Sequence, residues 1–110
     1  MSKKDEPEKI DEVTFTSPIN KSNSFAAWNV KKKTKSTMTL YFYRDTTGYI
    51  EWDIPAIDET VDIGLTFEFD RHGKRTLTEY DGIFAIPDEA LDLLEKNGVD
   101  VAEMRKAMQD

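Results

Sequence analysis

Apolar and polar residues alternate along two stretches of this chain, and each stretch leads into a turn that opens with aspartate and closes with glycine. The turns are Asp45–Gly48 and Asp70–Gly73. An aspartate side chain can open a type I turn, and glycine can adopt the positive φ that a bulged hairpin exit requires. The pattern therefore predicts two consecutive β-hairpins.

The first hairpin is expected to have one apolar face. Its first strand starts near residue 37 and places three apolar residues on one side: Met38, Leu40 and Phe42. A loop closed by a bulge would pair Asp45 with Tyr49. This register pairs apolar residues across the hairpin: Phe42 with Trp52 and Leu40 with Ile54.

The other face of this hairpin is expected to carry tyrosines and carboxylates. The same register pairs Tyr43 with Glu51 and Tyr41 with Asp53, and Tyr49 follows the turn. Tyrosine is enriched in protein interfaces, because its ring offers a large contact area at a low cost in conformational entropy. This polar face is therefore suited to solvent or to a binding partner.

The second hairpin has the most regular alternation of the chain, over residues 61–70. Its apolar positions are Val61, Ile63, Leu65, Phe67 and Phe69. With the turn at Asp70–Gly73, three couples of residues are expected to pair: Phe67 with Leu77, Phe69 with Arg75, and Thr66 with Thr78. A slip of one residue would reverse every side chain, so the shared apolar face supports this register.

A helix is expected over residues 88–97. Pro87 suits its first turn, Asp88 and Glu89 lie near the positive end of its dipole, and Gly98 can end it. Its apolar stripe consists of Ala90, Leu91, Leu93 and Leu94. This stripe would cover the apolar face of the sheet.

A second, shorter helix is expected to follow. Asp100 and Glu103 have the spacing of a capping box, with aspartate in place of the usual hydroxyl residue. The apolar side of this helix consists of Met104, Ala107 and Met108.

The domain boundaries follow from the amino-terminal pattern. Residues 1–10 are polar and lack periodicity, so a disordered tail is expected there, followed by a single domain over residues 11–110. Val13 and Phe15 predict an edge strand that ends at Ser17–Pro18. The fold class is α+β: an antiparallel sheet of four to five strands, largely two consecutive hairpins, packed on one or two carboxy-terminal helices. The expected core consists of Met38, Leu40, Phe42, Trp52, Ile54, Val61, Ile63, Leu65, Phe67, Leu77, Phe84, Leu91 and Leu94.

The amino-acid composition and the net charge indicate the cellular compartment and the class of binding partner. The 110 residues include no cysteine, which excludes disulfides and thiolate chemistry and fits a cytoplasmic protein. The start of the chain has no apolar signal segment, and no stretch has the length of a membrane span, so no membrane association is expected. The net charge of −7 disfavours nucleic acid as a partner and favours a protein.

One local group of residues is positively charged, although the chain as a whole is acidic. Four lysines precede the tyrosine-bearing strand: Lys31, Lys32, Lys33 and Lys35. Lysines beside Tyr41 and Tyr43 have the composition of a surface on which single-stranded nucleic acid stacks its bases. Against this, Glu51 and Asp53 on the same face would repel phosphate. Tyrosines are also common in strands generally, and lysines in solvated loops.

No catalytic, metal or cofactor site is expected. His72 is the only histidine and lies in a turn, so it has no second imidazole or thiolate with which to bind a transition metal. The acidic groups around Asp62 and Asp88 do not have the spacing of an EF-hand loop. No serine lies in a nucleophile turn, and a domain of this size offers little depth for an enclosed pocket. The protein is therefore not expected to be an enzyme.

The run Asp81–Pro87, which leads from the strands into the expected helix, gives a layout that resembles the PC4-like and Whirly-type single-strand-binding proteins. The resemblance covers roughly residues 37–97. Those proteins typically act as dimers and use strand faces rich in basic and aromatic residues. The resemblance implies single-stranded nucleic-acid binding through the lysines at 31–35 with Tyr41 and Tyr43, although the acidic sheet of this chain departs from that pattern.

The preferred hypothesis is a small non-enzymatic binding or regulatory domain that contacts another protein through the face bearing Tyr41, Tyr43 and Tyr49. The first alternative is the nucleic-acid surface described above. The second is an acidic inhibitor of the phage type, whose carboxylates mimic the DNA backbone and would have to form one continuous stripe. An exposed edge strand also allows a homodimer.

Overall fold

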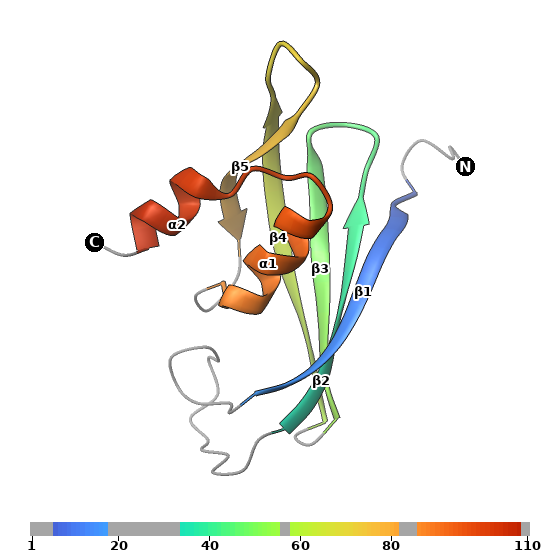
Figure 1. Cartoon of the computed structure of the whole chain (residues 1–110). Helices are drawn as coiled ribbons and strands as arrows, with labels where there is room; N and C mark the ends of the chain where they lie inside the picture. Colours follow the sequence, from blue (N-terminus) through green and yellow to red (C-terminus); the bar gives the residue numbers. More distant parts are fainter. Residues whose placement is uncertain (1–5, 18–33, 56–57, 82–85, 109–110) are drawn as a thin grey trace.

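The computed structural model describes residues 6–17, 34–55, 58–81 and 86–108. Within them, five antiparallel strands form one sheet in the order of the chain (Figure 1). They are β1 (Glu8–Ser17), β2 (Thr34–Phe42), β3 (Thr47–Ile54), β4 (Glu59–Phe69) and β5 (Arg75–Asp81). Two helices follow, α1 (Asp88–Lys96) and α2 (Ala102–Met108), which confirms the predicted α+β fold. The residues Lys31, Lys32, Lys33, Pro18 and Phe84, for which predictions were made, lie outside the described ranges.

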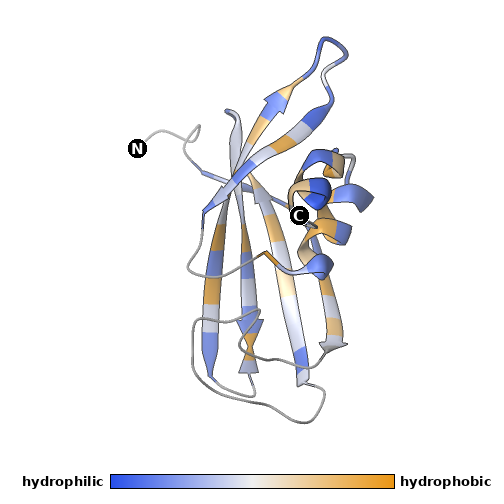
Figure 2. Cartoon of the chain, turned by 90° about the vertical axis from the view of Figure 1, so that its left-hand side faces the viewer, coloured by the Kyte–Doolittle hydropathy of each residue, from blue (hydrophilic) through white to orange (hydrophobic). Residues whose placement is uncertain are grey.

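Both helices lie on the same side of the sheet, and no described helix or strand covers the other side (Figure 2). Helix α1 begins after Pro87, has Asp88 and Glu89 in its first turn, and is followed by Gly98 with a φ of 84°. The same residues predicted this helix from the sequence. Pro87, however, is the N-cap of α1 and not a residue of its first turn. The sheet therefore has a helix-covered face and a face that we call the open face.

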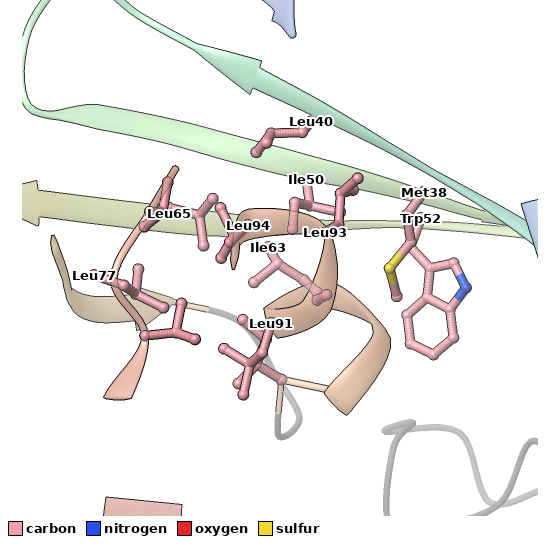
Figure 3. Close-up of a cluster of buried hydrophobic side chains, with 14 of the residues drawn as sticks. Met38, Leu40, Ile50, Trp52, Ile63, Leu65, Leu77, Leu91, Leu93 and Leu94 are labelled. Carbon is pink, nitrogen blue, oxygen red and sulfur yellow. The ribbon is translucent and has the colours of Figure 1, made fainter. Parts of the chain in front are cut away.

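The core lies between the sheet and α1. Leu91, Leu93 and Leu94 from α1 meet the apolar side chains of the central strands, including Leu40, Ile50 and Ile63 (Figure 3). Every expected core residue that the structure describes is buried. The expected list omitted six further apolar residues of the described core: Ile50, Ile86, Ala90, Leu93, Val99 and Val101.

The first hairpin turns earlier than predicted. The Tyr43 N–H donates to the Thr47 carbonyl oxygen at 3.0 Å, so residues 44–46 form the loop and Gly48 lies inside β3. The predicted pairs of Phe42 with Trp52 and of Leu40 with Ile54 are therefore wrong. The observed pairs are Phe42 with Gly48, Leu40 with Ile50, and Met38 with Trp52. The partner shifts by an even number of residues, so each side chain keeps its predicted face.

The second hairpin is largely as predicted. Phe67 faces Leu77 and Phe69 faces Arg75, and Gly73 has the expected positive φ of 82°. The Asp70 carboxylate accepts hydrogen bonds from the backbone N–H groups of His72 and Lys74 at 2.8 and 2.9 Å. A bulge after Thr66 then shifts the register, so Thr66 faces Glu79 and not Thr78, which corrects the third predicted pair.

The amino-terminal strand is longer than predicted. β1 starts at Glu8, so the expected tail over residues 1–10 extends too far, and Ile10 packs against the core. A bulge between Lys9 and Asp11 breaks the alternation from which strands are recognised. The bulge places Lys9 opposite Tyr41 and Asp11 opposite Leu40, on opposite faces of the sheet.

Asp11 connects β1 to the end of α1. Its carboxylate accepts a hydrogen bond from the Asn97 side-chain amide at 3.0 Å and lies 3.3 Å from the Lys96 ammonium. The hydrogen bond from Asn97 is the largest of the contributions that hold the pKa of Asp11 below its ordinary value. This contact fixes the helix against the first strand.

The chain between the helices returns to the sheet. The Asp100 N–H donates to the Arg75 carbonyl and the Leu77 N–H donates to the Asp100 carbonyl, both at 2.9 Å. The Asp100 carboxylate accepts a hydrogen bond from the Ala102 N–H, so it caps α2. The Asp100 N–H is already bonded to β5, and the predicted reciprocal capping box with Glu103 is therefore wrong. Met104 packs against the core as expected, whereas Ala107 is exposed.

Candidate binding surface on the open face of the sheet

The tyrosines predicted to form a site do gather on the open face. The rings of Tyr41 and Tyr49 are stacked, with centroids 4.6 Å apart and an angle of 15° between their planes. The Tyr43 ring lies 6.0 Å from that of Tyr49 and is tilted by 40°. We call Tyr41, Tyr43 and Tyr49 the tyrosine cluster.

The register of the first hairpin produces this cluster. Because the loop spans residues 44–46, Tyr41 lies directly opposite Tyr49. The predicted pairs of Tyr43 with Glu51 and Tyr41 with Asp53 are wrong for the same reason. The loop is fixed by Asp45, whose carboxylate accepts hydrogen bonds from both the backbone N–H and the hydroxyl of Thr47. This short-range contact holds the turn at Asp45 and so decides which rings meet.

Carboxylates lie on the same face, next to the cluster. Glu51 and Asp62 are direct neighbours across β3 and β4, and Glu12 lies in the same row on the far side of Thr39. We call Glu12, Glu51 and Asp62 the acidic row. Asp53 lies one step further along β3, between Thr37 and Thr60, and accepts a long hydrogen bond of 3.4 Å from the Thr60 hydroxyl.

The tyrosine cluster and the acidic row interact electrostatically. Burial is the largest of the factors that raise the pKa of Tyr49, followed by the neighbouring Tyr41 and Tyr43 rings. The carboxylates of Glu51 and Asp62 raise this pKa further, because they disfavour a second negative charge beside them. The surface around Tyr49 therefore has a negative potential and is suited to a positively charged group.

The structure does not bring the described lysine of the predicted cluster to the tyrosines. Lys35 faces Thr16 near the start of β2, and Tyr41 follows it by six residues, which is roughly 20 Å along a strand. The lysine that the described strands place beside the tyrosines is Lys9, which falls within the predicted tail. Lys9 lies opposite Tyr41 and forms an ion pair of 2.7 Å with Glu12.

Three residues of this surface were thus missed: Lys9, Glu12 and Asp62. Glu12 was visible as a polar position of the amino-terminal strand, but its place in the acidic row follows only from the pairing of β1 with β2. The bulge hides Lys9, because it removes the alternation that would have placed Lys9 on a strand. Asp62 was visible as a polar position of an alternating strand, but its neighbour Glu51 follows only from the pairing of β3 with β4, which was not predicted. β3 and β4 are joined by the short connection of residues 55–58, in which the Asp58 N–H donates to the Pro55 carbonyl oxygen, but the sequence pattern did not identify it as a hairpin turn.

The other described residues that were considered for catalysis or metal binding do not come together in one place. His72 lies exposed at the tip of the second hairpin. Glu59 and Asp62 lie on opposite faces of β4, as their partners Ile54 and Glu51 show. Within the described ranges, no three side chains of histidine, cysteine, aspartate or glutamate lie close enough together to hold a metal ion. No helix of the described residues is long and apolar enough to span a membrane.

Comparison of the chain with protein families, with curated proteins and with solved structures finds no match in any of the three. The interpretation of the open face therefore depends on its geometry and its charges.

Proposed function

We propose that this protein is a non-enzymatic interaction domain that binds another protein through the open face of its sheet. The observation that supports this most directly is the tyrosine cluster, a group of adjacent rings on a face that no described helix or strand covers. Tyrosines that are already stacked lose little conformational freedom when a partner binds, so they can serve as the centre of an interface. The rings would supply apolar contact, and their hydroxyls would supply hydrogen bonds.

The charges of the open face indicate the chemistry of the partner. Glu51 and Asp62 lie beside Tyr49, and Asp53 extends the same negative surface. Arginine and lysine side chains can pair with these carboxylates and also stack over tyrosine rings. The partner is therefore a protein surface that presents basic side chains around an apolar centre.

The single-strand-binding alternative has less support. Phosphate would have to approach the acidic row in order to place bases on Tyr41 and Tyr49, and Lys35 lies at the far end of its strand. The ion pair with Glu12 partly neutralises Lys9, the lysine that lies opposite Tyr41.

The acidic-inhibitor alternative is favoured by one observation. The acidic row crosses the sheet from β1 to β4 and is interrupted by Thr39 alone. A nucleic-acid-binding protein with a basic cleft has the charge that this row requires. Such a target is one kind of basic partner, so the same surface would carry both functions.

The test is affinity capture from native lysate with the tagged protein, at low and moderate salt, with and without nuclease. Wild type is compared with the Tyr41→Ala/Tyr49→Ala variant. The matched control is Thr16→Ala/Lys35→Ala, which changes two neighbouring residues at the other end of the open face. A circular dichroism melting curve for each variant checks that the fold is intact.

We expect one stoichiometric protein partner that survives nuclease treatment, is captured by the control variant and is lost with the tyrosine variant. A partner retained by the tyrosine variant would show that the cluster is not the interface. Recovery of nucleic acid that is sensitive to salt and nuclease would instead support the single-strand-binding alternative.

A further inference from the structure

Arg75 lies in an aromatic setting at the loop end of the helix-covered face. Its guanidinium carbon is 4.1 Å from the centre of the Phe42 ring, 4.8 Å from that of Phe69 and 5.7 Å from that of Phe67. Phe42 and Phe67 are themselves packed edge to face, with ring centres 5.3 Å apart. The register of β4 and β5 places Arg75 directly opposite Phe69. The rings thus hold the guanidinium in a fixed position.

This guanidinium has no anionic partner among the residues that the structure describes. None of their ion pairs includes Arg75, and its buried Nε–H finds no hydrogen-bond acceptor. A buried donor without an acceptor loses its bond to water and gains nothing in return. By contrast, Arg105 on α2 lies within 4 Å of three carboxylates, those of Asp88, Asp92 and Glu95.

Stacking on rings engages the flat faces of a guanidinium and leaves its terminal Nη–H groups available, whereas the Nε–H of Arg75 is buried. These groups form a planar fork that matches the two oxygen atoms of a carboxylate. Arginine keeps its positive charge at neutral pH even where burial lowers its pKa, as it does for Arg75. Arg75 therefore presents a fixed and charged donor group.

A hollow of about 720 Å³ adjoins this residue. Its apolar part includes the Phe42 ring and Ile10, and its charged lining consists of Arg75, Arg44, Glu6 and Glu8. This volume is in the range of small-molecule sites. Glu6 and Glu8 would repel a multiply charged phosphate, whereas a single carboxylate can pair with Arg75 while an apolar body lies on the rings.

We propose that the hollow beside Arg75 binds an organic monocarboxylate with an apolar body, and that Arg75 is the group that holds the carboxylate. A free aryl or alkyl acid and the carboxyl-terminal residue of a peptide share this chemistry. The hollow shares Tyr43 with the tyrosine cluster, whereas Tyr41 and Tyr49 are not part of its lining. The proposal rests on Arg75 and the rings around it and not on the function proposed above.

The test is a titration followed by nuclear magnetic resonance, in which the Arg75 Nε–H signal and the backbone amides are observed at constant ionic strength. The probes are phenylpropionate, for the free acid, and N-acetylphenylalanine, for a peptide terminus. Phenylpropionamide is the uncharged control, and inorganic phosphate is the control for a general anion site.

We expect a saturable shift of the Arg75 Nε–H signal with at least one carboxylate and none with the amide. The tighter of the two carboxylates identifies the source of the ligand. An equal response to the amide, the absence of a saturable shift, or tighter binding of phosphate would each overturn the proposal. These comparisons use the wild-type protein, so they do not depend on any variant that fails to fold.

Substitutions then assign the role of Arg75. We expect Arg75→Lys, which keeps the charge but loses the planar fork, to weaken carboxylate binding about tenfold. Arg75→Gln should abolish it, and the amide spectrum of each variant reports whether the fold is intact. The matched control is Arg71→Gln, which removes the same charge from an exposed position in the tip of the same hairpin. Equal affinity in Arg75→Gln and wild type would show that Arg75 does not hold the ligand.

Discussion

At the scale of single residues, Gly48 shows how a glycine can be required for a reason other than a turn. It lies inside β3, where an added Cβ would approach the Tyr41 carbonyl oxygen to 2.6 Å and the Phe67 ring to 3.0 Å. A backbone oxygen in a sheet cannot move away without breaking the ladder. Because Gly48 has no side chain, β2 and the Phe67 ring can pack closely against the start of β3.

We expect Gly48→Ala to destabilise the protein by about 2 kcal/mol, within the usual range for a strained and overpacked site. The measurement is urea denaturation followed by tryptophan fluorescence. The matched control is Gly64→Ala on the adjacent strand, where a new Cβ would meet Asp81 at an ordinary 3.6 Å. Equal losses in the two variants would show that close packing at Gly48 is not the cause.

The raised pKa of Tyr49 predicts how stability depends on alkaline pH. Burial and the neighbouring negative groups keep Tyr49 protonated above its ordinary pKa of 10.0, whereas the unfolded chain ionises there. The contribution of protonated Tyr49 to the free energy of unfolding is therefore complete below pH 10.0. It is lost as the pH rises from there through the raised pKa of Tyr49 in the folded protein.

We expect wild type to lose more unfolding free energy than Tyr49→Phe over this alkaline range, because phenylalanine has no proton to lose. Urea denaturation at a series of pH values measures the difference. In an ultraviolet titration of the folded proteins, the ionisation that Tyr49→Phe removes should lie above pH 10.0. Parallel stability profiles for the two proteins would contradict the proposed environment of Tyr49.

At the scale of elements, the two helices are held by different kinds of contact. Helix α1 presents Leu91 and Leu94 to the sheet, and both side chains are completely buried. Helix α2 is connected to α1 through Arg105, whose guanidinium lies 2.6 Å from the Asp92 carboxylate. The carboxylates around Arg105 are exposed to solvent, which weakens these ion pairs.

We therefore expect Leu91→Ala to cost about 3 kcal/mol, because it leaves a cavity between α1 and the sheet. Arg105→Ala should cost less than about 1 kcal/mol, in line with exposed ion pairs. Chemical denaturation of both variants in the same buffer gives the comparison. A larger loss for Arg105→Ala would mean that the docking of α2 contributes more to stability than burial of the α1 stripe.

The elements also show what local sequence can predict. The strand from residue 61 and helix α1 were predictable, because a periodic pattern and clear end signals agree there. The register of the first hairpin was not, because Asp45 could fix the loop in more than one place and Gly48 resembled a turn residue. β1 was shortened in the prediction by its bulge.

At the scale of the whole molecule, a five-stranded sheet in chain order has its helices on one face, so no described helix or strand covers the face that bears the tyrosine cluster and the acidic row. The tyrosine cluster was predictable as a set of residues, because alternation fixes the face of each side chain. Its stacked geometry and the acidic row depend on register between strands, which the sequence pattern did not resolve. The pairing of Arg75 with Phe69 was predicted, but its contact with the Phe42 ring on β2 left no signal in the local sequence.

The return of the chain to the sheet at Asp100 also limits how copies of this protein can associate. The hydrogen bonds at Arg75 and Leu77 occupy the outer backbone of β5 at these positions, so another strand could not add there without displacing Asp100. The opposite edge of the described sheet is β1. Two copies that paired through β1 would each use the same edge, so this pairing would close as a two-fold dimer and leave no free β1 edge for a third copy.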